Sequence, residues 1–206
     1  MPTLLQCSVI IPVYNLAKYI SPMLKSLKEQ KLGDYNIEII FVINNCTDRT
    51  EEVIMESGLE CRILYCHEQG CGPARNRGFE EAHGKYIWFM DGDDWLLSNT
   101  AIKDVLDKAY NDNLDILRIP FASERYKQNY FSMVWQYLFK KDFIEEIKFP
   151  SVQPAEDDAF MIKVLAKKGM SWAEHLSLPH IDETLYYYNF MRPGSNMMRY
   201  YAGEKI

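Results

Sequence analysis

The sequence contains no dense block of lysine or arginine and no long hydrophobic run. Its 23 basic and 29 acidic residues give a formal net charge of -6 and a pI of about 5.3. Proteins that bind nucleic acid by charge carry a basic patch, so the composition argues against a nucleic-acid partner. The N-terminal residues show no basic region followed by an apolar one. We therefore expect no export signal and no transmembrane segment.

Cysteine is too scarce for a protein held together by disulfides. The five cysteines are an odd number, and none of them forms a Cys-x-x-Cys pair. This usage fits a cytoplasmic protein, although a disulfide between Cys66 and Cys71 stays open. No stretch rich in proline, glycine and serine divides the 206 residues, of which 48% are hydrophobic. The chain is therefore expected to form one domain, residues 1–206.

The first half of the sequence alternates between strand patterns and helix patterns. Strands are expected at 7–13, 37–43, 62–65 and 86–90. Helices are expected at about 20–32, 47–57 and 73–82. Pro12 is expected to end the pairing of the first strand. This alternation predicts an α/β fold with a mainly parallel twisted sheet and helices on both faces.

The alternation loosens after Asp94. The second half is expected to contain a helix at about 100–110, a strand at 116–120, a helix at 156–167 and a late strand at 185–190. Many aromatic residues follow residue 120, and core packing explains most of them. The second half is therefore interpreted as an α+β region that packs against the first.

Polar residues follow the first two predicted strands, at the sheet edge where open α/β proteins bind ligands. Tyr14 offers a ring and a hydroxyl to a planar base, although a simple turn gives the same pattern. Asn44 can hydrogen-bond the edge of a base, while Thr47 or Asp48 is expected to cap the helix that comes next. Each of these signals is weak when taken alone.

The third strand end is rich in glycine, over residues 70–78. Glycine allows close approach of the backbone, and the start of a helix directs N–H groups toward an anion, with Arg75 one turn further on. The spacing is neither a dinucleotide fingerprint nor a Walker loop. The segment therefore indicates an anion site without naming the ligand.

The fourth strand end carries the strongest signal, because Asp91, Asp93 and Asp94 lie within four residues. Crowded carboxylates repel one another, and a divalent cation with oxygen ligands removes that cost. Asp91 and Asp93 fall on one side of an extended segment, so they can share one ligand while Asp94 turns away or caps the next segment of the chain. An acidic turn with a capping residue would need only one aspartate.

Three further acids, Glu156, Asp157 and Asp158, open the predicted helix at 156–167. Acidic residues at a helix N-terminus are stabilised by the helix dipole, which accounts for one or two of them. A carboxylate held over a substrate can also remove a proton from an acceptor hydroxyl. The residues alone leave open which of the three would do so.

Taken in order, five motifs resemble those of family 2 glycosyltransferases with the GT-A fold. They are residues 8–15, 44–50, 72–78, 84–94 and 156–160. The resemblance spans about residues 7–196, and the common order and spacing of the motifs make it specific. It implies transfer of a sugar, with inversion, from a nucleotide diphosphate sugar, usually a UDP-sugar, to an acceptor hydroxyl. Synthesis of cell-surface polysaccharide or glycoconjugate is the implied setting.

The resemblance also implies roles for individual residues. The nucleotide-sugar site would consist of Pro12, Val13, Tyr14, Asn44, Arg75, Asp91, Gly92 and Asp93. Asp93, with Asp91 as a second ligand, would hold a divalent metal, Mn²⁺ or Mg²⁺, and Asp157 would be the catalytic base. The donor would bind in about residues 1–110. A saccharide or lipid-linked acceptor would bind in about residues 111–206, with peripheral membrane association left open.

The sequence departs from the family pattern at Ile43 and Asn44, where paired aspartates are common. This departure weakens the expected preference for uridine and raises the alternative of a catalytically silent nucleotide-sugar-binding module. A sugar nucleotidyltransferase is a second alternative, but the first strand end lacks the glycine-rich basic loop that it needs. Further candidates are His180 for the metal and Tyr130, Trp135 and Trp172 for the acceptor pocket, with a structural role expected for His180 and core packing for each of the three aromatic residues.

Overall fold

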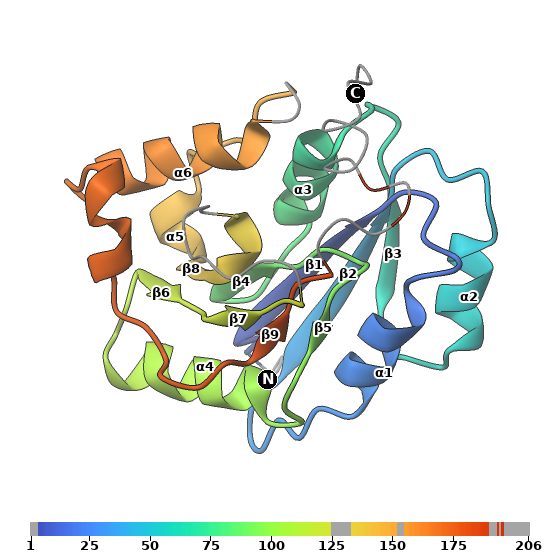
Figure 1. Cartoon of the computed structure of the whole chain (residues 1–206), viewed down its shortest axis with the longest axis horizontal. Coiled ribbons are helices and arrows are strands. Elements are labelled where there is room, and N and C mark those ends of the chain that lie inside the picture. The colour runs from blue at the N-terminus through green and yellow to red at the C-terminus, as the bar shows by residue number, and fades with distance from the viewer. Residues whose placement is uncertain (1–3, 125–132, 152–154, 190–192, 194, 196–206) are drawn as a thin grey trace.

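The computed structural model describes residues 4–124, 133–151, 155–189, 193 and 195. A six-stranded sheet in the order β3-β2-β1-β4-β8-β6 forms its centre (Figure 1). β1 to β4 run parallel, and β8 is antiparallel to both of its neighbours. The strands are β1 (Cys7–Val13), β2 (Ile37–Ile43), β3 (Arg62–Tyr65), β4 (Tyr86–Phe89), β6 (Ile116–Arg118) and β8 (Tyr137–Lys140). The mainly parallel sheet predicted from the sequence is confirmed.

Helices cover both faces of this sheet, as predicted. One face packs against α1 (Ser21–Lys28), α2 (Thr50–Glu56) and α4 (Ala101–Asn111). The other packs against α3 (Cys71–Glu80), α5 (Lys141–Ile144) and α6 (Glu156–Lys167). Alternate residues of β1 divide between the two layers, since Val9 and Ile11 join the first core cluster and Ile10 joins the second.

A small second sheet brings the late part of the chain back to the end of β4. It consists of β5 (Trp95–Leu96), β9 (Tyr186–Tyr187) and β7 (Phe121–Ala122), in that order. Tyr186 stacks on Trp135, which lies in the short 3-10 helix η1 (Val134–Gln136), with ring centroids 4.7 Å apart. Both rings are buried, so aromatic packing fixes β9 beside η1.

Pro12 lies inside β1, so the prediction that it ends the strand pairing is wrong. It pairs with Val42, and the ladder with β2 continues to Val13 and Ile43. Pairing of β1 with β4 has already ended at Ile10 and Phe89. Residues two apart in a strand direct their N–H groups to the same side, so an N–H at Pro12 would point toward β4, like that of Ile10. Because β4 no longer pairs with β1 at Pro12, the missing N–H costs no hydrogen bond.

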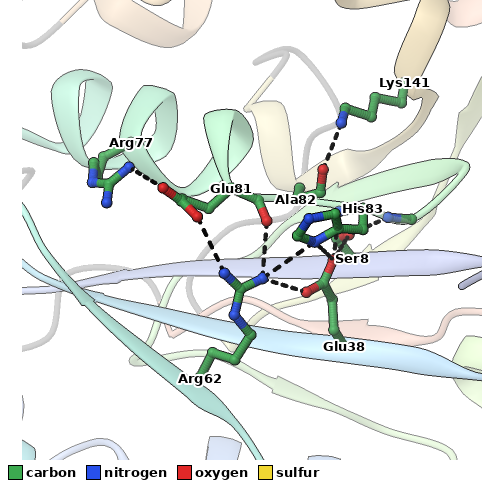
Figure 2. Close-up of polar contacts among 9 residues, drawn as sticks. Ser8, Glu38, Arg62, Arg77, Glu81, Ala82, His83 and Lys141 are labelled. Carbon is green, nitrogen blue, oxygen red and sulfur yellow. Dashed lines mark hydrogen bonds and ion pairs between the residues drawn. The ribbon is translucent and has the colours of Figure 1, made fainter.

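A polar network fixes the C-terminal end of α3 to the sheet (Figure 2). The Glu38 carboxylate on β2 accepts hydrogen bonds from the Ser8 hydroxyl at 2.7 Å and from the His83 N–H at 2.6 Å. It also pairs with Arg62 on β3 at 2.7 Å, and Arg62 donates to the Glu81 carbonyl at 2.9 Å. The end of α3 is thereby held over three neighbouring strands.

The last turn of α3 lies directly on the sheet. A Cβ at Gly78 would come within 2.4 Å of Ile10 Cγ2 and 3.1 Å of Val42 Cγ2. Only glycine therefore fits this close approach of helix and sheet. The helix begins at Cys71, two residues before the predicted start.

Two further expectations concern the membrane and the thiols. Among the described residues, no helix combines the length and the apolar character needed to cross a membrane. Cys66 and Cys71 do not form a disulfide, which closes the alternative that the sequence leaves open.

The network around Glu38 predicts a loss of stability in acid. Burial raises the pKa of Glu38, but hydrogen bonds from His83 and Ser8 and the ion pair with Arg62 outweigh it, and the net pKa is lowered. A carboxylate with a lowered folded-state pKa adds stability above its unfolded pKa of about 4.3, and this stability disappears as the pH falls through the folded pKa. We expect Glu38→Gln to cost about 1.5–3 kcal/mol at pH 7, the usual contribution of hydrogen bonds to a charged group.

Urea unfolding at pH 7 and in acid measures this effect. The free energy of unfolding should fall less steeply between pH 5 and pH 3 in Glu38→Gln than in the unaltered protein. Glu56→Gln is the matched control, because Glu56 forms an exposed pair with Arg49 at 3.2 Å. Equal pH dependence in all three proteins would contradict the role given to Glu38.

Candidate functional site

The candidate site lies where the C-terminal ends of β1, β2 and β4 meet the N-terminal end of α3. The turn after β4 carries Asp91 to Asp94, and the Asp94 N–H donates to the Asp91 carbonyl at 3.1 Å. The strand order places β1 between β2 and β4, so residues that come after three strands gather at one edge. This is the edge at which the sequence predicted a ligand.

Asp94 points into the protein and has the structural role that was expected. Its carboxylate accepts hydrogen bonds from the Tyr186 hydroxyl at 2.7 Å and from the Asn189 N–H at 2.8 Å. Burial, followed by the charges of Asp93 and Asp91, raises the pKa of Asp94 well above its usual range. The Tyr186 hydroxyl also accepts from the Asp91 N–H at 3.2 Å. Asp94 therefore anchors the late strand to the acidic turn.

Asp91 and Asp93 stay partly exposed at the site, and Gly92 sets how closely their turn packs. A Cβ at Gly92 would lie 2.7 Å from Leu16 Cδ1 and 3.0 Å from Val13 Cγ1, so a side chain there would push the turn off β1.

Within the described residues, no group of three or more His, Cys, Asp or Glu side chains could hold a metal ion. Two carboxylates suit Mg²⁺ or Mn²⁺, whose remaining ligands are substrate phosphates and water.

Arg75 joins the acidic turn to the start of α6. Its guanidinium is buried, donates to Asp91 Oδ1 at 2.8 Å and to Asp157 Oδ1 at 2.6 Å, and lies 3.5 Å from Glu156 Oε1. Burial lowers the pKa of Arg75, but Asp157 and Asp91 outweigh it and raise the pKa well above its usual value. Arg75 is therefore a fixed positive charge between carboxylates that lie 16 and 82 residues away in sequence.

Of the three acids at the start of α6, Asp157 makes the most direct contact with the site. Its Oδ2 accepts from the Val134 N–H at 3.1 Å, while Oδ1 faces Arg75. Burial raises the pKa of Asp157 to about 7, with Arg75 lowering it and Glu156 raising it. Asp158 is exposed to solvent. A carboxylate with a pKa near 7 suits a general base at neutral pH.

The nucleotide-side residues differ in what they offer to a ligand. Pro12 and Val13 are buried within β1, while Tyr14 is 48% exposed at the sheet edge. Asn44 is buried and holds the segment before α3, because its amide donates to the carbonyls of Cys66 at 2.9 Å and Glu68 at 2.7 Å. Its Oδ1 accepts from the Gly70 N–H at 3.0 Å. Both amide hydrogens of Asn44 are therefore used within the protein.

The loop after β2 does not cap α2 as expected, because Arg49 is the N-cap residue and no side chain makes a cap hydrogen bond there. α2 begins at Thr50, and Asp48 Oδ1 accepts from the Thr50 N–H at 3.0 Å. Thr47 does not cap the helix; its N–H donates to Asn15 Oδ1 at 2.8 Å and joins the loops after β1 and β2. These loops form the rim beside Tyr14.

The remaining candidates lie apart from this cluster or outside the described residues. Trp135 is buried in the aromatic core, as expected, and His180 lies 3.7 Å from Asp182 rather than in any metal-binding group of described side chains. Trp172, at the start of the 3-10 helix η2 (Trp172–Ser177), is 36% exposed, and Tyr130 lies outside the described residues.

Sequence reasoning missed Tyr186 as the partner of Asp94 and Asn76 as a partner of Phe149. Both residues lie within segments that the sequence marks, the late aromatic run and the motif at 72–78. Their partners lie more than 70 residues away. No local pattern indicates such a pairing.

Comparison with known sequences gives a consistent result. Residues 8–168 match the family described as glycosyl transferase family 2. The glycosyltransferase EpsJ of Bacillus subtilis is 28% identical, and the match covers 88% of this chain and 60% of EpsJ. The poly(ribitol-phosphate) beta-N-acetylglucosaminyltransferase TarS of Staphylococcus aureus is 26% identical, over 98% of this chain and 38% of TarS. The chain thus spans 60% or less of the length of these relatives.

Solved structures share the fold. TarS residues 1–349 in complex with UDP-GlcNAc superposes with a TM-score of 0.82 at 22% identity, over 94% of this chain and 61% of that one. Glucosyl-3-phosphoglycerate synthase of Mycobacterium tuberculosis, with Mn²⁺, UDP and phosphoglyceric acid, gives 0.70 at 15% identity, over 91% and 72%. The architecture is the GT-A fold, and with the family match over residues 8–168 the chain belongs to glycosyl transferase family 2.

Proposed function

We propose that the protein transfers a sugar from a nucleotide diphosphate sugar, a UDP-sugar by preference, to an acceptor hydroxyl. The observation that carries the proposal is the ion cluster in which Arg75 contacts both Asp91 and Asp157. Through Arg75, Asp157 lies close to the turn that carries Asp91 and Asp93, which supports a base next to a metal and diphosphate site. The structure of TarS with UDP-GlcNAc, at a TM-score of 0.82, supports a UDP-sugar donor.

The donor would bind in about residues 1–110. Tyr14 is exposed for stacking on the base, with Pro12, Val13 and the Asn44 loop as its surroundings. Asp93 and Asp91 would hold Mn²⁺ or Mg²⁺, and Gly92 lets the turn that carries them lie against β1. The metal, when bound, would neutralise the negative charge that develops on the departing diphosphate. GT-A structures that contain Mn²⁺ or Mg²⁺ support this assignment.

Asp157 would remove the proton from the acceptor hydroxyl. The acceptor oxygen forms a bond to the anomeric carbon as the bond from that carbon to the diphosphate breaks, and the diphosphate leaves with the electron pair. Attack from the face opposite the diphosphate inverts the anomeric configuration. Asp157 lies on α6 and so reaches the site from a different element than the turn that carries Asp91 and Asp93.

The acceptor is proposed to be a saccharide or a lipid-linked saccharide, bound by about residues 111–206. Relatives named for teichoic acid biosynthesis and for poly(ribitol-phosphate) support a role in cell-surface polymer synthesis. We propose that the reaction takes place in the cytoplasm or at the inner face of the membrane. A catalytically silent binding module is disfavoured, because Asp91, Asp93 and Asp157 are all present and Asp157 lies 2.6 Å from the Arg75 that also contacts Asp91.

Asp93→Asn should abolish the metal dependence of nucleotide binding. Calorimetry of UDP with and without Mn²⁺ measures this, and we expect Mn²⁺ to tighten binding to the unaltered protein by at least tenfold and to Asp93→Asn by less than twofold. Asp104→Asn is the control, because Asp104 lies on α4 and accepts from the Thr100 hydroxyl at 2.7 Å. If binding is indifferent to Mn²⁺ in the unaltered protein, the proposed metal site is wrong.

Asp157→Asn should keep donor binding and lose transfer. The amide has nearly the shape of the carboxylate but cannot take the acceptor proton, so kcat should fall by about 10²–10⁴-fold, the usual worth of a general base. Release of UDP from UDP-GlcNAc in the presence of a cell-wall saccharide acceptor measures transfer, and UDP–Mn²⁺ calorimetry measures binding. Unaltered kcat in this variant would remove Asp157 from the mechanism.

The pH dependence of kcat/KM should also reflect the role of Asp157 as the base. Because the base acts only when it is deprotonated and the pKa of Asp157 is raised to about 7, kcat/KM should fall as the pH drops below about 7, by roughly tenfold per unit. The residual activity of Asp157→Asn should lack this limb. A flat profile from pH 5 to pH 8 in the unaltered enzyme would contradict the assignment.

A further inference from the structure

Asn76 holds the main chain of Phe149 from two sides. Its side-chain Nδ2 donates to the Phe149 carbonyl at 2.9 Å, and its Oδ1 accepts from the Phe149 N–H at 2.9 Å. The two residues lie 73 positions apart in sequence. Asn76 thereby satisfies both backbone groups of a residue that lies in no helix or strand, and it ties that residue to α3.

Phe149 passes this constraint on to the helix that carries Asp157. Its ring stacks on Phe160 with the centroids 3.9 Å apart and the planes 4° from parallel. Phe160 is buried on α6, three residues after Asp157. The Arg75 guanidinium lies 5.4 Å from the centre of the same Phe149 ring.

α3 leaves little room for this segment to shift. A Cβ at Gly72 would lie 2.5 Å from the Pro150 carbonyl oxygen and 3.2 Å from Phe149 Cβ. The other polar side-chain contacts of the described part of this segment are exposed: Lys148 pairs with Glu80 at 3.1 Å, and Ser151 donates to Glu68 at 2.6 Å. Exposed contacts of this kind restrain a segment weakly, so among these polar contacts the Asn76 clamp restrains the main chain most strongly.

We propose that Asn76 is a positioning residue, which sets where Asp157 stands relative to Asp91 by holding Phe149 against α3. This inference rests on the proposed function only where it predicts that loss of Asn76 slows sugar transfer. Asn76 acts through Phe149 and α6 and needs no contact with donor or acceptor. Loss of the clamp should leave nucleotide binding in place and misplace the base.

The variant Asn76→Ala tests the proposal, with Gln30→Ala as its matched control. The Gln30 amide makes the same kind of clamp at another place, donating to the Ser98 carbonyl at 2.7 Å and accepting from the Ile102 N–H at 3.1 Å. Both variants lose a partly buried amide that bridges main-chain groups. They differ in whether the released segment leads to Asp157.

Hydrogen exchange and steady-state kinetics provide independent readouts. In Asn76→Ala, amides of residues 149–160 should exchange at least tenfold faster than in the unaltered protein; in Gln30→Ala those of residues 98–102 should do so. With UDP-GlcNAc as donor, Asn76→Ala should lower kcat at least tenfold and change the donor KM less than threefold. Gln30→Ala should keep kcat within twofold.

Each outcome decides a separate point. Unchanged exchange over 149–160 in Asn76→Ala would overturn the clamp, whether or not the enzyme is active. Faster exchange there with unaltered kcat, or an equal loss of kcat in Gln30→Ala, would overturn the positioning role. If the unaltered protein transfers from no nucleotide sugar, the proposed function fails, and the exchange experiment still decides whether Asn76 holds the segment.

Discussion

The site depends on one buried cation, the Arg75 guanidinium, placed among Asp91, Glu156 and Asp157. Removing charges from water is costly, and their mutual attraction offsets that cost only when the geometry is good. The planar guanidinium provides this geometry, because its two terminal nitrogens reach carboxylates on different elements at 2.8 and 2.6 Å. Without it, the acidic turn and the start of α6 would repel each other. The same charge that stabilises the cluster keeps the proposed donor side and base side together.

α3 gives Arg75 a fixed position. At its C-terminal end the network of Glu38 and Arg62 holds the connection after the helix to the sheet (Figure 2). In its last turn, Gly78 lets the helix rest directly on Ile10. At its N-terminal end, Asn44 fixes the chain that enters the helix by accepting from the Gly70 N–H at 3.0 Å. A helix restrained at three places can hold a buried charge to the accuracy that catalysis needs.

Much of the fold can be predicted from local patterns, and much of the site cannot. β1, β2 and β3 match their predicted bounds, because buried parallel strands are continuous apolar runs. The structural role of Asp94 could also be predicted from the sequence, because Asp91 and Asp93 fall on one side of an extended segment and Asp94 turns away from them. The prediction that Pro12 ends the strand pairing is wrong, because a sequence does not show which of the two neighbouring strands still pairs at that residue. The partners of Arg75 and Asn76 lie 82 and 73 residues away, and only the folded chain brings them together.

A double-mutant cycle on Arg75→Lys and Asp157→Asn tests the central claim, that one guanidinium joins donor side and base side. A lysine ends in one compact ammonium nitrogen in place of the two terminal nitrogens that reach Asp91 and Asp157, so it should pair Asp157 less well. From the free energies of unfolding in urea at pH 8, the effects of the two substitutions should differ from additivity by at least about 1 kcal/mol, as for residues in direct contact. Effects that add within about 0.3–0.5 kcal/mol, the behaviour of independent sites, would contradict the claim.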